Sequence, residues 1–286
     1  MPILLYPACS HAFPMKTSNV ATKNAGGWES HLLIVLSLAA YALALARVWW
    51  PAYLPGKSDW PEAMLLVLAT ASTIAALTRH LPLQNVLYAA FFIGLAVGAV
   101  EWLDLKTGIP FGLFTPGQNT GLKLFHALPW TMPLIWILAI LNSRGVARLI
   151  LRPWRKTRVY GFWLIGITAS LTVLFDLAFD PFASRVKQYW FWEPTKFPLT
   201  WQGAPLVNFF GWAVVTLLIL AFITPMLINK NPVHRRPPDF HPLGVWLGGV
   251  LLFGAGSATL GLWSAVLLDG IAGIVVAVFA VRGARW

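Results

Sequence analysis

Two pairs of carboxylic acids are the residues of this sequence best suited to do chemistry. Glu101 and Asp104 stand three residues apart, and Asp176 and Asp180 stand four apart, each pair at the end of a long apolar run. Residues at these spacings share one face of a helix. Carboxylic acids inside membrane spans are rare and usually functional. A carboxyl group with apolar walls can act as a general acid.

The composition shows which elements must position these acids. Of 286 residues, 58% are hydrophobic and 11% are charged, whereas a soluble globular domain carries about 25% charged residues. So few charged groups do not cover a water-facing surface, and we therefore expect an integral protein of the lipid bilayer. The net charge of +11 does not indicate a nucleic-acid partner, because the basic residues fall between apolar runs, where they indicate topology.

The apolar runs predict an all-α, polytopic transmembrane helix bundle of about eight spans, with seven as the alternative. A span needs roughly 20 apolar residues. We expect a cytosolic tail over residues 1–30 and a single transmembrane domain over 31–286. The expected spans are 31–50, 60–78, 86–103, 122–141, 160–180 and 205–229, and residues 242–281 fit either two short spans meeting near 260–262 or one long span plus a loop.

Basic residues predict how this bundle is oriented. Six Lys and Arg residues lie between Arg144 and Arg158, and three lie between Lys230 and Arg236. Both segments should be cytoplasmic. The N-terminus is then also cytoplasmic, and we expect a multi-pass protein of the bacterial inner membrane. Both acid pairs, together with Asp269 of the last span, then lie toward the outer side.

Two loops are expected on that same side. Residues 106–121 are rich in Gly and Pro, which predicts a shaped turn covered by protein or water. Residues 181–204 are rich in aromatic side chains and lead into Asn208 of the sixth span. We therefore expect polar groups from spans three, five, six and eight to converge on one aromatic-walled pocket.

Each of these groups also has an ordinary structural interpretation. The acids can be helix-end charges in the headgroup region, or ion-pair partners of Arg47 or Lys106. Asn208 can form a hydrogen bond between helices, and His126, near the outer start of span four, is more often structural than catalytic. A pocket of this kind suits either proton-driven alkene chemistry on a long lipid-soluble substrate or a lipid transporter.

Four segments carry a resemblance to a known family. Residues 101–112, 176–181, 190–192 and 205–212 resemble, in order and spacing, the CruF-type carotenoid biosynthesis membrane proteins, which include carotenoid 1,2-hydratases. The resemblance implies addition of water to the terminal C1,C2 double bond of an acyclic ψ-end, giving a tertiary alcohol. The implied substrate is an acyclic or monocyclic carotenoid. No cofactor and no metal ion are implied, and no oligomeric state is assigned.

On this resemblance Asp176 or Glu101 is the expected acid, and Asp180 or Asp104 the carboxylate that acts on water. The residues expected to contact the substrate are Pro110, Phe111, His126, Trp190, Trp192, Asn208 and Trp212. The alternatives are another carotenoid end-group enzyme, either a cyclase or an elongase, and a non-catalytic lipid or proton transporter. An elongase needs Asp-rich motifs for a magnesium diphosphate on the cytoplasmic side, whereas the acids here are predicted on the other side.

Overall fold

The computed structural model describes residues 27–50, 60–117, 122–124, 128–194, 199–228 and 237–286. Within these residues, eight helices are long and apolar enough to cross a membrane, which confirms the all-α, polytopic fold and the count of eight spans. The helices are α1 (Gly27–Trp49), α2 (Trp60–Thr78), α3 (Leu83–Thr107), α4 (Met132–Ile150), α5 (Tyr160–Pro181), α6 (Leu206–Ile223), α7 (His241–Thr259) and α8 (Trp263–Ala284).

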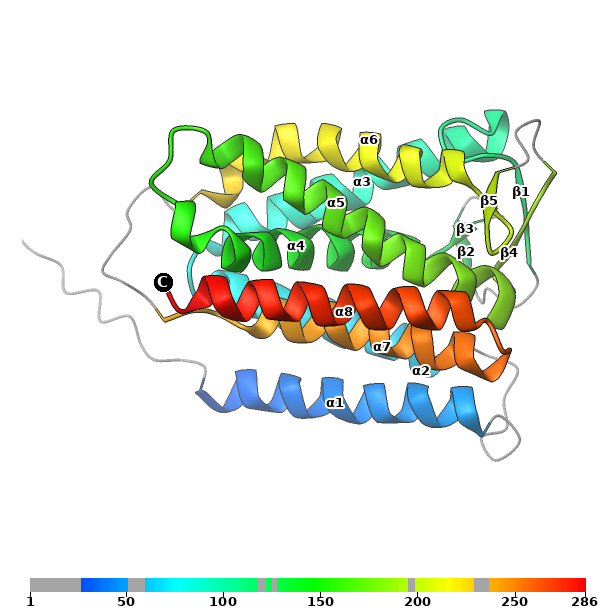
Figure 1. The fold of residues 1–286 in the computed structure, drawn as a ribbon, viewed down its shortest axis with the longest axis horizontal. Helices are drawn as coiled ribbons and strands as arrows, with labels where there is room; N and C mark the ends of the chain where they lie inside the picture. Colours follow the sequence, from blue (N-terminus) through cyan, green and yellow to red (C-terminus); the bar gives the residue numbers. More distant parts are fainter. Residues whose placement is uncertain (1–26, 51–59, 118–121, 125–127, 195–198, 229–236) are drawn as a thin grey trace, which may run out of the picture.

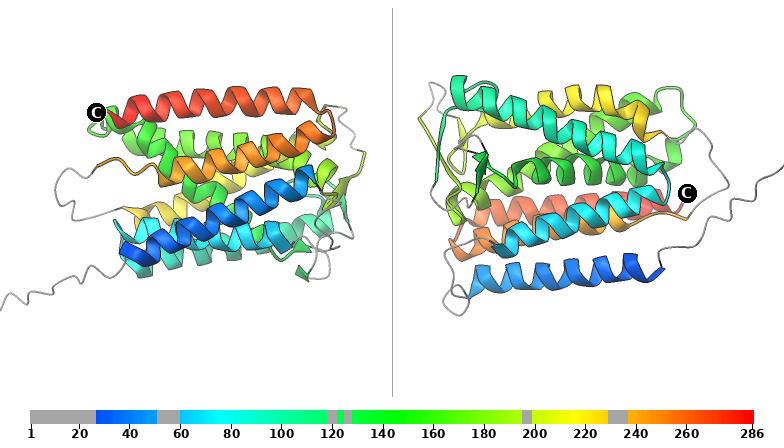
Figure 2. Two further views of the ribbon diagram at one scale, coloured as in Figure 1. Left: turned by 90° about the horizontal axis from the view of Figure 1, so that it is seen from below. Right: turned by 180° about the vertical axis from the view of Figure 1, so that it is seen from behind.

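Helix α4 lies at the centre of the bundle. It packs against α2, α3, α5, α7 and α8, and most of its residues are buried because these helices surround it. Helix α1 lies at the edge and contacts α2 and α7, as the two views of Figure 2 show. The core therefore surrounds α4, and α1 is a peripheral span.

Short strands gather at one end of the bundle, which we call the strand end (Figure 1). Strand β1 (Phe114–Pro116) pairs antiparallel with β4 (Trp190–Trp192), β2 (Lys123–Leu124) with β3 (Leu128–Pro129), and β5 (Thr200–Trp201) with β6 (Ala204–Pro205). The β1–β4 pair joins the loop after α3 to the loop after α5. The described parts of the two loops are thus joined to each other at this end.

The opposite end, which we call the basic end, holds the α4–α5 connection and the C-terminus (Figure 1). A 3₁₀ turn, η2 (Arg152–Trp154), follows α4, and η4 (Thr224–Leu227) follows α6. Helix α1 also starts at this end. Its start and the C-terminus therefore share one side of the bundle, as the expected topology requires; the direction of the bundle across the membrane stays a prediction. Of the tail predicted for residues 1–30, residues 1–26 lie outside the described residues.

The third span extends beyond its predicted end. Helix α3 continues to Thr107, where Gly108 takes a left-handed conformation with φ of 67° and donates its N–H to the carbonyl oxygen of Asp104 at 2.6 Å. Glycine adopts this conformation without steric strain, which ends the helix. Glu101 and Asp104 consequently lie within the last two turns of α3, and both are buried.

The fourth span was predicted wrongly. Residues 122–124 and 128–129 form the strands β2 and β3, and α4 begins only at Met132, with Pro133 in its first turn. Proline is favoured there because its missing N–H has no partner in the helix. Arg144, predicted in a cytoplasmic loop, lies buried within α4 and donates through Nη2 to the carbonyl oxygen of Leu227 at 3.0 Å.

The last part of the chain forms two spans. Helix α7 ends at Thr259 and α8 begins at Trp263, with Gly261 at φ of 67° between them. This confirms the interpretation of residues 242–281 as two short spans and excludes the single long span with a loop.

Candidate functional site

A small cavity inside the strand end collects the predicted acids; we call it the acid cavity. Its volume is about 20 Å³, which is room for about one water molecule. The acids come from two helices, Glu101 from α3 and Asp176 and Asp180 from α5, and all three are buried. The full lining is Glu101, Phe111, Phe114, Met132, Asp176, Asp180, Trp190, Trp192, Asn208 and Trp212.

Asp180 is held by the two tryptophans of strand β4. The indole N–H of Trp190 donates to Oδ1 at 3.1 Å, and that of Trp192 lies 3.1 Å from both carboxyl oxygens. Indole nitrogens only donate, and such bonds are strongest when the acceptor is an ionised carboxylate. The pairing of β4 with β1 therefore brings Asp180 two donors that suit its charged form.

Asp176 is paired with the amide of Asn208. Nδ2 of Asn208 donates to Oδ2 of Asp176 at 2.9 Å, and both side chains are buried. Asn208 lies in the first turn of α6, a helix that begins directly after Pro205. Because an amide offers both donors and an acceptor, Asn208 can bond either protonation state of Asp176. Asn208 therefore forms a hydrogen bond between α6 and α5 and also lines the acid cavity.

Glu101 is bonded to Trp136, a residue that the sequence reasoning missed. The indole N–H of Trp136 donates to Oε1 of Glu101 at 3.3 Å. Its ring stacks on Trp212, with centroids 3.6 Å apart and planes 7° apart. Because span four was expected to begin ten residues earlier, Trp136 was not placed at the level of the acids. With α4 beginning at Met132, it lies one turn inside the strand end.

Asp104 holds the turn that follows α3. Its Oδ1 accepts a hydrogen bond from the backbone N–H of Phe111 at 2.8 Å, and Asp104 is not among the residues that line the acid cavity. The turn is pressed against α6, because a Cβ at Gly211 would lie 2.7 Å from the Phe111 ring and 2.8 Å from the Pro110 carbonyl oxygen. Phe111 reaches the cavity wall, whereas Pro110 contributes backbone packing.

Two further expected residues do not join this group. Asp269 of α8 is buried against Gly254 of α7 and is not part of the acid cavity lining, so the predicted contribution of span eight is corrected. His126 lies outside the described residues. Among the residues that are described, no three or more His, Cys, Asp or Glu side chains are grouped so that they could hold a metal ion.

Comparison with known proteins shows the family of the chain. Residues 62–278 match the model of a family described as carotenoid biosynthesis protein. The chain belongs to this family. The match spans α2 to α8 and includes every residue of the acid cavity lining.

A curated relative carries a more specific name. The chain is 28% identical over 126 residues to the bisanhydrobacterioruberin hydratase of Haloarcula japonica. The aligned residues cover 43% of this chain and 40% of that protein. The chain therefore matches less than half of the length of this relative. No solved structure matches the chain. The chain is thus a multi-pass carotenoid biosynthesis protein.

Proposed function

We propose that this carotenoid biosynthesis protein adds water to the terminal C1,C2 double bond of an acyclic ψ-end carotenoid. The observation that carries the proposal is the acid cavity: three carboxyl groups surround a space with room for about one water molecule, behind aromatic walls. The name of the Haloarcula relative, a hydratase, supports the same reaction class.

The first step is protonation of the alkene. Asp176 or Glu101, in its carboxylic acid form, transfers a proton to C2, and the π electrons form the new C–H bond. The positive charge then lies on C1, which is tertiary. Trp212, Phe111 and Trp192 line the cavity, and aromatic faces stabilise a cation electrostatically.

The second step is attack by water. The water oxygen forms a bond to C1, and Asp180 takes the proton that water loses. Two indole donors favour Asp180 as the carboxylate at the start of the reaction. The product is a tertiary alcohol, and the net change is addition of one water molecule. One proton passing from Asp180 to the first acid restores both groups, and Asp176 stands one helical turn away on the same face of α5.

Water addition changes no net oxidation state, so the proposed reaction needs no redox cofactor. Asp104 acts as a positioning residue in this scheme, because it holds Phe111 and the turn rather than lining the cavity.

Expression in a bacterial host that accumulates lycopene tests the proposal. We expect a more polar pigment, heavier by one or two waters, with the polyene absorption unchanged. Asp180→Asn, with the protein still in the membrane, should abolish the new pigment. An isomer of equal mass with a shifted absorption spectrum indicates cyclisation and contradicts hydration.

A further inference from the structure

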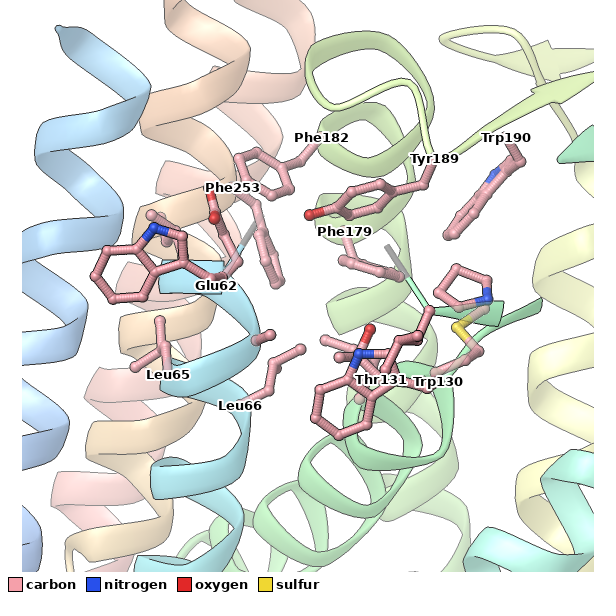
Figure 3. A pocket seen from close by; sticks show the side chains of 17 residues that line it. Glu62, Leu65, Leu66, Trp130, Thr131, Phe179, Phe182, Tyr189, Trp190 and Phe253 are labelled. Carbon is pink, nitrogen blue, oxygen red and sulfur yellow. The ribbon is translucent and has the colours of Figure 1, made fainter. Parts of the chain in front are cut away.

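A second, larger cavity lies beside the acid cavity; we call it the lateral cavity. Its volume is about 250 Å³, and its walls come from the first turns of α2, the segment leading into α4, the end of α5 and α7. Figure 3 shows Phe179 and Tyr189 between Leu66 of α2 and Trp190 of β4. The space therefore extends from α2 toward the wall of the acid cavity.

The lateral cavity has walls that suit a long apolar chain. Phe179, Phe182, Tyr189, Trp130 and Phe253 present aromatic surface to it. Ligand sites for apolar molecules are lined in this way, with few polar groups. A flat conjugated chain gains contact area from such faces, so the walls fit a polyene better than a polar metabolite.

A buried ion pair fixes the α2 wall of this cavity. Glu62 in the first turn of α2 accepts a hydrogen bond from Nζ of Lys187, which follows the π-helix η3 (Phe182–Val186). The Lys187 ammonium also lies 5.8 Å from the centroid of the Phe182 ring. The pair joins α2 to the segment after α5, so both sides of the lateral cavity are held at a set separation.

The lateral cavity reaches the surface of the bundle. Two of its lining residues, Trp60 at the start of α2 and Leu122, are 50% and 78% exposed. Both lie near the strand end, where the sequence predicts the outer boundary of the membrane. A lipid-soluble chain therefore has a route into the cavity from the surrounding bilayer.

The lateral cavity and the acid cavity share a wall. Met132 and Trp190 line both spaces. Trp190 is positioned by its hydrogen bond to Asp180, whereas methionine is flexible and adapts to irregular shapes. Because the acid cavity has room for about one water molecule, the carotenoid chain must approach the acids from the lateral side, past Met132 and Trp190.

We propose that the lateral cavity binds the acyclic end of the carotenoid, with its terminal double bond passing Met132 and Trp190 to reach the acids and the water of the acid cavity. This assignment rests on the proposed hydration. The polyene then lies between α2 and the end of α5, and its terminal double bond meets the water among the carboxyl groups.

Lycopene binding to the full-length protein in lipid nanodiscs tests the assignment without turnover. The background carries Asp176→Asn, and lycopene retained per protein after gel filtration is the readout. Leu66→Trp and Ala63→Trp place a larger side chain on the cavity wall and should weaken lycopene retention at least tenfold. Val67→Trp is the matched control, because Val67 is 43% exposed on the same helix and does not line the cavity.

The helix content, measured by far-ultraviolet circular dichroism, and the gel-filtration profile show whether each variant is folded. Unchanged retention in folded Leu66→Trp and Ala63→Trp overturns the assignment, as does equal loss in Val67→Trp. The same substitutions in the otherwise unchanged protein separate the two proposals. If the protein without substitutions hydrates lycopene and the single variant Leu66→Trp does so at the same rate, the lateral site is refuted and hydration is not. If lycopene retention falls in Leu66→Trp and Ala63→Trp but the protein without substitutions forms no hydrated pigment, hydration is refuted and the lateral site is not.

Discussion

The substitution Gly211→Ala tests whether the turn after α3 must press against α6 for the site to work. A Cβ at this position lies 2.7 Å from Cδ1 of Phe111 and 2.8 Å from the carbonyl oxygen of Pro110. Nonbonded atoms prefer about 3.5–4.0 Å, so either the turn or α6 must shift by about 1 Å. A displacement of that size can lower a rate about 100-fold. The crowding should also destabilise the fold by about 1–3 kcal/mol.

The assay is the rate at which hydrated pigment forms per folded protein in lycopene-loaded membranes, with folded protein measured by gel filtration. Gly166→Ala is the control, because Gly166 is helical, exposed on α5 and has no atom within 4 Å of the added Cβ. We expect a fall of about 100-fold for Gly211→Ala and no fall for Gly166→Ala. Full activity in folded Gly211→Ala refutes the role of the turn.

Three further substitutions separate chemistry from stability. Asp176→Asn should lower hydration by about 10²–10⁴-fold in a folded protein, the range for loss of a general acid; an unchanged rate argues against Asp176 as that acid. Trp136→Phe removes the donor to Glu101, a bond worth about 1.5–3 kcal/mol, and should lower hydration about tenfold or more; wild-type rates would show that the bond is dispensable. Arg144→Met removes the bond to the Leu227 carbonyl and should lower the free energy of unfolding by about 1.5–3 kcal/mol while hydration per folded molecule stays unchanged, and equal stability contradicts the expectation.

Hydropathy was sufficient to find the spans, because a helix in lipid must satisfy its backbone internally and present apolar side chains. It placed α2 at residues 60–78 and divided residues 242–281 correctly. It failed where apolar residues do not form a helix. Residues 122–131 contain several apolar side chains, yet part of this segment pairs as β2 and β3. Because of that error, Trp136 was not predicted at the level of the acids, and Arg144 was predicted in a loop.

The convergence of the acids followed from spacing and topology together. Glu101, Asp176, Asp180 and Asn208 were predicted on one side of the membrane, and they meet at the acid cavity. Asp269 shared their predicted side but faces Gly254 instead, because depth in the membrane does not fix the direction in which a helix faces. The indole bonds to Asp180 depend on the β1–β4 pairing, which no local pattern indicated.

The lateral cavity was not predictable from the sequence. Its walls combine residues from four helices and two loops, and no spacing rule relates Leu66 to Phe179 or Phe253. Glu62 was not singled out, because an acid in the first turn of a helix is common at an exposed helix end. Only the packing of α2 against the segment after α5 makes it a buried partner of Lys187.

Hydration of lycopene in D₂O by membranes that contain the protein tests the central claim most directly. Protonation of C2 by an exchangeable carboxylic acid predicts a product with one carbon-bound deuterium at C2 and one hydroxyl group for each end that reacts, read by mass spectrometry and NMR. A hydroxylated product with no carbon-bound deuterium would contradict protonation of the alkene.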